Sequence, residues 1–459
     1  MIYGIDMQIR QTNEDEKAAA LLDKYIPEMR GMAASNKEAG GFSIRMLSKY
    51  MNGAVSEETL KQLDQELKKL GIENGGISPA EKERIKLYQQ IAAKDASKKN
   101  EKEIFCNTEV RPGEIWRDTR GNRIEAHAGG MLYEDGVYYW YGENKEHTDG
   151  ISRIWTWGIR LYASRDFYNW TDMGLIIPPV LDDPNSDLFP EKRVDRPHIV
   201  KNKKTGKYVC WLKLCGASAS FVVLTADKLT GPYTVVREQY NPFGMKIGDF
   251  DISVDEDNQI AYLYCDAEHD MIVGIRLDET YTEGMEIVSK QYEHLHPPFC
   301  REAVTVFERK KRLYMLTSGM TGYVPNQSDS AVAGGYEDTF VSIGDPHVKD
   351  ASMASFNSQI GQVFKVPGKK DLYVTIADRW VPEYIVDYKR ADILRRAIAS
   401  NHAPEKYQVT DEEKRELMKA PMLESANTHL ATYVLLPICF DGDKLKIEWK
   451  DSWKLEDYE

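Results

Sequence analysis

Three acidic side chains and one amide stand beside apolar, strand-like runs of this chain. Glu143 ends YYWYGE, Asp195 lies in VDRPHIV, Glu302 lies in CREAVTVF and Gln359 lies in SFNSQIGQVF. If these segments meet, they suit glycoside hydrolysis, in which a protonated carboxyl expels the leaving oxygen while a second group activates water or attacks the sugar. A neighbouring carboxylate raises the pKa of such an acid and keeps it protonated. The alternative is a set of ion pairs or turn caps, because the chain holds 73 acidic residues.

Other polar motifs carry weaker signals. His127 in IEAHAGG could bind a metal, donate to a ligand or lie in the core, and metal binding is the weakest of these because no HxH or HExxH partner is present. The glycines after it do not form a phosphate loop of the GxxxxGKS or GxGxxG kind. Ser318 in SGMTGY lies outside a GxSxG elbow and is interpreted as structural. We therefore expect neither a metal nor a cofactor.

The elements that would position these side chains have a period of two from about Ile104 onward. Five aromatic and β-branched runs open with a tyrosine after a turn: Tyr138, Tyr208, Tyr262, Tyr314 and Tyr373. Their spacings of 70, 54, 52 and 59 residues predict a five-bladed β-propeller, with a ligand site where the innermost strands converge. A β-sandwich is the alternative. The C-terminal segment YVLLPICFDGDKLKIEW is a further hairpin, suited to complete the last blade or seal the ring.

Residues 1 to about 96 have a helical period instead. Leucines at positions 60, 63, 67 and 70 lie on one face of a helix, and Gly71 predicts its C-terminal end. Ser78 to Glu81 form a capping box that starts another helix, which runs to about Ala96, and DASKKNEKE is a linker. We predict a helical N-terminal domain over residues 1–100 and a propeller domain over residues 101–459, an all-β fold class with a helical appendage.

Composition excludes several classes of function. With 60 Lys and Arg against 73 Asp and Glu, the net charge of −13 argues against sequence-independent nucleic-acid binding. No run of about 18 apolar residues predicts a membrane span. The N-terminus has no signal-peptide pattern, and the six cysteines have no CxxC or zinc spacing, so we expect a cytoplasmic protein with reduced, mostly buried cysteines. Aromatic residues make up 10% of the chain, which favours strands and ligand sites walled by flat rings.

Taken together, the motifs resemble glycoside hydrolase family 43, in its exo-β-1,3-galactanase-like branch. The resemblance starts at RPGEIWRDTRGNRIEAHAGGMLYEDGVYYWYGENKE and continues through VDRPHIVKNKKTGKYVCWLK, GDFDISVDEDNQIAYL, REAVTVFERKKRLYMLTSGMTGYVPNQ, SFNSQIGQVFKV and ADRW. It covers about residues 108–453, and the first 100 residues lie outside it. It implies a five-bladed β-propeller and inverting hydrolysis of terminal sugars.

The resemblance also implies roles for individual residues. Glu302 matches the general acid, and Asp195 matches the acidic residue that orients and tunes it. The strand that carries a general-base Asp in most of the family reads IEAHAGG here, so the resemblance implies Gln359, as its imidic-acid tautomer, for the base, with Glu143 as the other candidate. Residues in the shared motifs are expected to bind substrate: His127, Asp249, Thr321, Tyr323, Asp378, Arg379 and Trp380.

Four positions depart from the branch. HGGG reads HAGG with Ala128, the acidic residue before Arg-Pro is Asp195 where Glu is frequent, REAP reads REAV with Val304, and TSGxTGW ends in Tyr323. These departures are compatible with hydrolysis, but they leave the sugar and the linkage open.

The sequence therefore predicts an exo-acting glycosidase that releases galactose from β-linked galactosides, with an oligosaccharide or glycoside as its partner. An α-L-arabinofuranosidase or β-xylosidase of the same family is the nearest alternative. A non-catalytic sugar-binding propeller is the alternative from another class, because loss of the usual base can leave a binding module. The N-terminal helices could mediate homo-oligomer formation or lean over the pocket, and a plain packing role is the alternative that we favour.

Overall fold

The structure is a computed structural model in which residues 3–35, 39–49, 51, 54–97, 105–216, 219–421, 423 and 425–459 are described. The chain divides into two compact units. The first comprises Met1–Asn100 together with Val180–Phe189, and the second comprises Glu101–Pro179 together with Pro190–Glu459. We describe each unit by itself.

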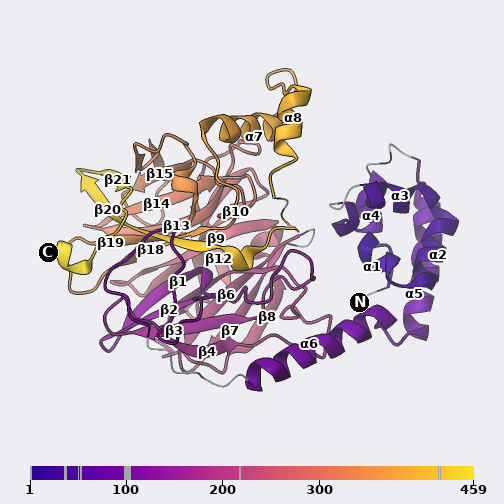
Figure 1. Ribbon diagram of the computed structural model, residues 1–459, viewed down its shortest axis with the longest axis horizontal. Helices are drawn as coiled ribbons and strands as arrows, with labels where there is room; N and C mark the ends of the chain where they lie inside the picture. The colour runs from indigo at the N-terminus through magenta and orange to yellow at the C-terminus, as the bar shows by residue number, and fades with distance from the viewer. Residues whose placement is uncertain are drawn as a thin grey trace. The chain divides into compact units, whose positions relative to one another are not determined.

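The first unit is helical, as predicted (Figure 1). Its helices are α1 (Ile9–Asn13), α2 (Glu16–Tyr25), α3 (Pro27–Ser35), α4 (Ile44–Lys49), α5 (Glu57–Glu73) and α6 (Pro79–Ser97). Apolar side chains on one face of α2 and of α5 share a core that includes Leu22, Leu63, Leu67 and Leu70. The predicted capping box starts α6, because Ser78 N donates to Glu81 Oε2 (3.0 Å) and Glu81 N donates to Ser78 Oγ (3.2 Å).

Gly71 does not end α5, which corrects the sequence prediction. The helix continues to its C-cap at Asn74. A glycine is needed at position 71 for packing, because a Cβ atom there would lie 2.6 Å from Cβ of Tyr3. The left-handed conformation after the helix is adopted by Gly75 and Gly76, with φ of +67° and +78°.

The second unit is a five-bladed β-propeller, as predicted, in which consecutive strands of a blade pair antiparallel. The first blade contains β1 (His127–Glu134), β2 (Val137–Glu143), β3 (Ile159–Ser164) and β4 (Thr171–Ile177). The second contains β5 (Val194–Lys201), β6 (Tyr208–Leu214), β7 (Ser220–Ala226) and β8 (Thr234–Tyr240). The third contains β9 (Ile247–Asp255), β10 (Ile260–Ala267), β11 (Met271–Leu277) and β12 (Gly284–Gln291).

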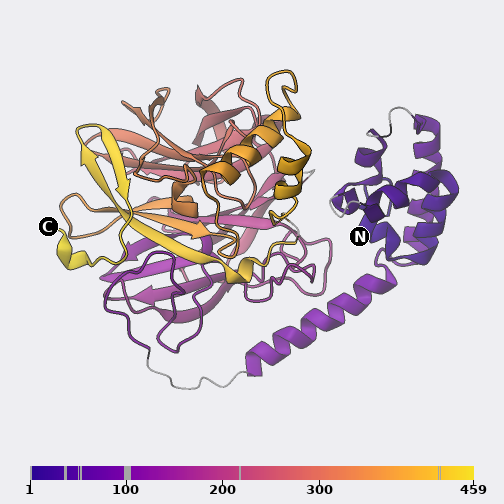
Figure 2. The same cartoon turned by 45° about the horizontal axis from the view of Figure 1, so that its top comes forward.

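The last two blades follow the same order. The fourth contains β13 (Arg301–Arg309), β14 (Arg312–Gly319), β15 (Ser328–Ala333) and β16 (Val341–Gly344). The fifth contains β18 (Gln359–Lys365), β19 (Tyr373–Arg379), β20 (Thr432–Asp441) and β21 (Lys444–Glu448), with the short β17 (His347–Val348) pairing parallel to β21. The predicted C-terminal hairpin thus completes the last blade, and it is drawn in yellow in Figure 2.

The first strands of the blades contact one another in a ring. β1 contacts β5, β5 contacts β9, β9 contacts β13, β13 contacts β18, and β18 contacts β1. The five tyrosines used to predict the blades lie in the second strands, β2, β6, β10, β14 and β19. The segments before the first blade and after the last blade are also hydrogen-bonded to each other. Val110 N donates to Trp453 O (2.9 Å), and Trp453 N donates to Val110 O (3.0 Å).

A helical insertion between β19 and β20 was not expected from the sequence. It contains α7 (Tyr388–Ser400) and α8 (Asp411–Leu417), which Figures 1 and 2 show next to each other in gold. Asp387 caps α7 by accepting a hydrogen bond from Arg390 N. Ala391 of α7 packs with Val324 and Ala354, so the insertion covers loops that precede β15 and β18.

Two expectations from composition also bear on the fold. All six cysteines are free, and three of them, Cys210, Cys265 and Cys300, are buried, so burial holds for half of the thiols rather than most. Within the described part of the chain, no helix is both long enough and apolar enough to cross a membrane.

Candidate active site

Three of the four predicted acid and amide residues lie where the first strands of different blades begin, and Glu143 ends the second strand of the first blade. Asp195 and Arg196 open β5, Glu302 opens β13, and Gln359 opens β18. The strand register shifts directly after Asp195 and after Glu302, and the residues that follow them, Arg196 and Ala303, both have a φ of 50°. Such bulges bend a strand and redirect its side chains. The local backbone therefore turns these functional groups out of the regular alternation of the sheet.

Gln359 links Glu302 to the rest of the cluster. Its Nε2 donates to Glu302 Oε1 (3.2 Å) and to Ser318 Oγ (3.0 Å). Its Oε1 accepts from Arg196 Nη2 (2.7 Å) and from Trp380 Nε1 (3.2 Å). All four hydrogen-bonding positions of the amide are engaged, so its orientation is set by its neighbours.

Asp249 is a buried carboxylate that binds two cations and the backbone next to Glu302. It forms ion pairs with Arg196 Nε (2.7 Å) and with Lys213 Nζ, and it accepts a hydrogen bond from Ala303 N (3.1 Å). Burial would raise the pKa of Asp249, but the two cations lower it well below its ordinary range. Glu302 behaves in the opposite way, because burial and the nearby charge of Asp249 raise its pKa to about 8. Glu302 is thus a carboxyl that stays protonated at neutral pH.

Glu143 is buried at the end of β2 and faces the start of β5. Its Oε1 accepts from Arg196 N (2.8 Å), and its Oε2 lies 2.6 Å from Lys145 Nζ. Burial and the charge of Asp195 raise the pKa of Glu143 to about 7, while Lys145 opposes that rise. Glu143 and Asp249 are therefore each paired with cations of the protein itself.

Asp195 contacts an indole and a thiol rather than Glu302. Trp155 Nε1 donates to its Oδ1 (2.6 Å), and Cys215 Sγ donates to its Oδ2 (2.7 Å). The Trp155 ring stacks with Tyr323 (centroids 6.1 Å apart), and Tyr323 tilts against Trp380 (5.1 Å). Three aromatic rings from separate connections therefore line the region between Asp195 and Gln359.

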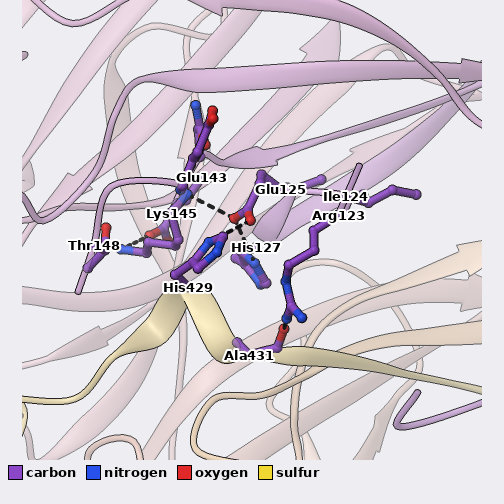
Figure 3. Close-up of polar contacts among 12 residues, drawn as sticks. Arg123, Ile124, Glu125, His127, Glu143, Lys145, Thr148, His429 and Ala431 are labelled. Atoms are coloured by element: carbon purple, nitrogen blue, oxygen red, sulfur yellow. Dashed lines mark hydrogen bonds and ion pairs between the residues drawn. The ribbon is translucent and has the colours of Figure 1, made fainter. Parts of the chain in front are cut away.

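His127 and Asp378 are buried and paired with each other. His127 Nδ1 lies 2.8 Å from Asp378 Oδ1. On the other side of the ring, His127 Nε2 lies 3.3 Å from Glu125 Oε2 (Figure 3). Asp378 also accepts from Ala128 N (2.8 Å). Burial lowers the pKa of His127, but the two carboxylates outweigh it and raise the pKa to about 9. These contacts favour an internal role for both residues over the sugar contact that the sequence predicted.

Two other predicted substrate-binding residues, Thr321 and Arg379, donate side-chain hydrogen bonds to backbone carbonyls of the protein. Thr321 Oγ1 donates to Val324 O (2.6 Å). The Arg379 guanidinium donates to the carbonyls of residues 356 (2.9 Å) and 357 (3.2 Å) and lies over the Trp449 ring. The structure brings together Glu143, Asp195, Asp249, Glu302, Tyr323, Gln359 and Trp380. His127 and Asp378 lie beside this set, because the His127 ring is 5.9 Å from the Trp380 ring and Asp378 is opposite Gln359 in the β18–β19 register.

Sequence reasoning did not identify Lys145, Trp155, Arg196 and Lys213. The first and third had a local signal, because Lys145 follows Glu143 by two positions and Arg196 is next to Asp195. Trp155 had none, since it lies 40 residues before the aspartate that it binds.

Comparisons with known proteins point to one family. A sequence model of the family described as "Glycosyl hydrolases family 43" matches residues 125–389, which is more than half of the chain. A search of curated proteins found no match.

Several solved structures have a similar fold. A family 43 β-1,3-galactosidase is 26% identical, with a TM-score of 0.60 over 77% of this chain and 64% of that chain, so this chain spans just under two thirds of its length. A second family 43 β-1,3-galactosidase, with galactodeoxynojirimycin, is 23% identical, with a TM-score of 0.59 over 75% of this chain and 100% of that chain. An exo-β-1,3-galactanase from Phanerochaete chrysosporium, with β-1,3-galactotriose, is 22% identical, with a TM-score of 0.59 over 76% and 68% of the two chains.

Proposed function

Because the chain belongs to glycosyl hydrolases family 43, we propose that it is an exo-acting glycosidase that releases terminal galactose from β-linked galactosides by an inverting mechanism. The observation that carries the proposal is Glu302, a half-buried carboxyl whose raised pKa keeps it protonated beside Gln359. A protonated carboxyl beside other carboxylates is the group that glycoside hydrolysis needs to expel the leaving oxygen.

Glu302 is the general acid in this proposal. Among the described residues, Gln359 donates to one carboxyl oxygen of Glu302, Oε1, and in this proposal Oε2 carries the transferable proton. Proton donation makes Glu302 anionic, and the Arg196 and Lys213 cations that surround Asp249 then stabilise the new charge.

Gln359 and Glu143 are the two candidates for handling the attacking water, and at Gln359 the water would take the place of one of the four hydrogen bonds of the amide. Arg196 connects them, since its main-chain N–H binds Glu143 and its guanidinium binds Gln359. Glu143 with a pKa of about 7 can accept a proton near neutral pH. Asp195 acts on this part of the site, because its charge contributes to the raised pKa of Glu143.

The choice of galactose is supported by the similar solved structures, two β-1,3-galactosidases and an exo-β-1,3-galactanase. The rings of Trp155, Tyr323 and Trp380 supply flat apolar surfaces of the kind that stack on sugar faces.

An activity screen tests the proposal. The full chain is incubated with nitrophenyl glycosides of galactose, arabinose and xylose and with β-1,3-galactan, and the anomer of the first product is followed by NMR. We expect α-galactose from a β-galactoside and a loss of about 10²–10⁴-fold in rate for Glu302→Gln. Arabinose or xylose as the only product would overturn the choice of sugar, a β-anomer would overturn inversion, and calorimetric binding without turnover would indicate a sugar-binding propeller.

We also propose a cytoplasmic location, supported by six cysteines that are all free. Cell fractionation with an antibody against the chain tests it, and recovery in the extracellular fraction would contradict it.

A further inference from the structure

Lys145 is a buried cation that the proposed mechanism does not use. Its side chain has no exposed surface. Its Nζ lies 2.6 Å from Glu143 Oε2, and it donates to Trp155 O (2.8 Å) and to Thr156 Oγ1 (3.2 Å). A buried ammonium is costly unless its hydrogen bonds and its charge are both satisfied. Here Trp155 O and Thr156 Oγ1 accept its hydrogen bonds, and the Glu143 carboxyl lies close enough to balance its charge.

The backbone of Lys145 is also held in place. Its N–H donates to Glu125 Oε2 (3.3 Å), and its carbonyl accepts from Thr148 N (2.9 Å), as Figure 3 shows for the surrounding cluster. Glu125 is in turn paired with His127 (3.3 Å) and with His429 Nδ1 (2.9 Å). The backbone from which the Lys145 side chain reaches Glu143 is therefore held by its own hydrogen bonds.

The same ammonium fixes the segment that reaches Asp195. Trp155 O accepts from Lys145 Nζ and also from Thr148 Oγ1 (3.1 Å). Lys145 Nζ lies 5.2 Å from the centre of the Trp155 ring, whose Nε1 donates to Asp195 Oδ1 (2.6 Å). Thr156 Oγ1, which contacts Lys145, donates to Val194 O next to Asp195 (2.7 Å). The Lys145 ammonium thus pairs with Glu143 directly, and it also contacts Trp155 and Thr156, whose hydrogen bonds hold Asp195 and the residue before it.

We propose that Lys145 is a positioning residue that keeps Glu143 as a carboxylate and holds Trp155 against Asp195, so that one buried cation organises the half of the site that handles water. The effect of Lys145 on turnover rests on the proposed hydrolysis. The effect of Lys145 on the ionisation of Glu143 is independent of that proposal.

The charged and titratable groups around Glu143 come from several elements. Lys145 follows β2, Asp195 and Arg196 open β5, and Tyr323 follows β14. Of these, Lys145 directly pairs with the carboxylate, and Asp195 acts in the opposite direction. Removal of the Lys145 charge therefore raises the pKa of Glu143 further, and the carboxyl becomes protonated at neutral pH.

The test compares four variants of the full chain. Three are the single variants Lys145→Met, Lys145→Gln and Glu143→Gln, and the fourth combines Glu143→Gln with Lys145→Met. Lys145→Gln removes the charge but keeps a donor for Trp155 O. Lys203→Met, at an exposed lysine paired with Glu256, is the matched control. The readouts are the pH profile of kcat/KM on the galactoside and a titration of ¹³C-labelled glutamate carboxyls, assigned with Glu143→Gln.

We expect the Glu143 carboxyl to titrate about 1–3 pH units higher in both Lys145 variants and unchanged in the control. The acidic limb of kcat/KM moves by the same amount, and Lys145→Met causes no such shift in the Glu143→Gln background. An unchanged Glu143 titration in a folded Lys145→Gln or Lys145→Met protein would overturn the proposal, as would a shift that persists without Glu143. If the wild type hydrolyses no glycoside, the proposed function fails, while the carboxyl titration still decides the role of Lys145.

Discussion

At the scale of single residues, burial and charge separate the carboxyl groups of the site into two kinds. Asp249 contacts two cations and stays ionised, whereas Glu302 is close to Asp249 and keeps its proton. Two carboxyls in one cluster thus acquire opposite protonation states because their nearest partners differ, and this leaves Glu302 with the proton that a general acid needs.

Glu302 predicts an alkaline limit to activity. A general acid must be protonated, and the Glu302 pKa of about 8 places loss of its proton above that pH. We expect kcat/KM to fall as pH rises through about 8 on an unactivated galactoside. A dinitrophenyl galactoside needs no protonation of its leaving group, so its kcat/KM loses the alkaline limb, and Glu302→Gln retains most activity on it. An alkaline limb that persists on the activated substrate would belong to a group other than Glu302.

At the scale of elements, local sequence patterns located strands and helices well but misjudged some ends and insertions. The tyrosine repeat located the second strand of each blade, since alternation and turn residues act over a few positions. The role of Gly71 was predicted wrongly, because a glycine is needed there for close packing against Tyr3, which lies far away in sequence. The α7–α8 insertion between β19 and β20 was not predicted from the sequence.

Gly71→Ala is predicted to destabilise the first unit in spite of the higher helix propensity of alanine. The new methyl group would overlap the Tyr3 side chain, and overpacking of this kind costs about 1–3 kcal/mol. Urea unfolding and amide hydrogen exchange in α5 measure the change. Ile72→Ala is the neighbouring control, because Ile72 is 82% exposed and its substitution should stay within about 0.5 kcal/mol. A Gly71→Ala protein as stable as the wild type would contradict the packing explanation.

The His127 contacts join the first blade to the last. His127 on β1 binds Asp378 on β19 and Glu125, and its pKa of about 9 in the fold exceeds the ordinary 6.5. Its contribution to stability is therefore complete below about pH 6.5 and is lost as pH rises through about 9. We expect His127→Gln to cost about 3–5 kcal/mol at pH 6 and to reduce the fall in stability between pH 6.5 and 9.

Denaturant unfolding across this pH range measures the effect. His294→Gln is the control, because His294 is 87% exposed and lies 3.8 Å from its only close carboxylate among the described residues. The pH dependence of the His127→Gln protein should differ from that of the control. The same pH dependence in both proteins would show that His127 does not carry the charge that joins the blades.

At the scale of the whole molecule, the chain contains two units with separate apolar cores. The core of the first unit is built from the helices that precede residue 74, and those of the second are built from the blades. The domain boundary at residue 100 and the association of the N-terminal helices stay predictions.

A chain that starts at residue 105 tests both. We expect it to fold as a propeller with a single calorimetric transition and to keep its activity, because the blades bury their own core. Residues Val180–Phe189 belong to the first unit, where Phe189 contacts Tyr88 (5.7 Å), so their hydrogen exchange should rise after truncation. Light scattering of both proteins reports whether the helices are needed for oligomers. Loss of cooperative unfolding in the shortened chain would contradict the boundary, and the same number of chains per particle in both proteins would contradict the helix-mediated oligomer.

The sequence by itself determined the blade repeat, the helical first unit and the acid and amide candidates, because alternation, caps and turns depend on neighbours a few positions away. Only the tertiary structure decided which side chains share a site. Trp155 meets Asp195 from 40 residues away, and Arg196 meets Gln359 from 163 residues away. Those pairings arise from the closure of five blades into a ring, which brings the starts of β5, β13 and β18 together, and the pKa values of Glu302 and Glu143 follow from the burial and charges that closure creates.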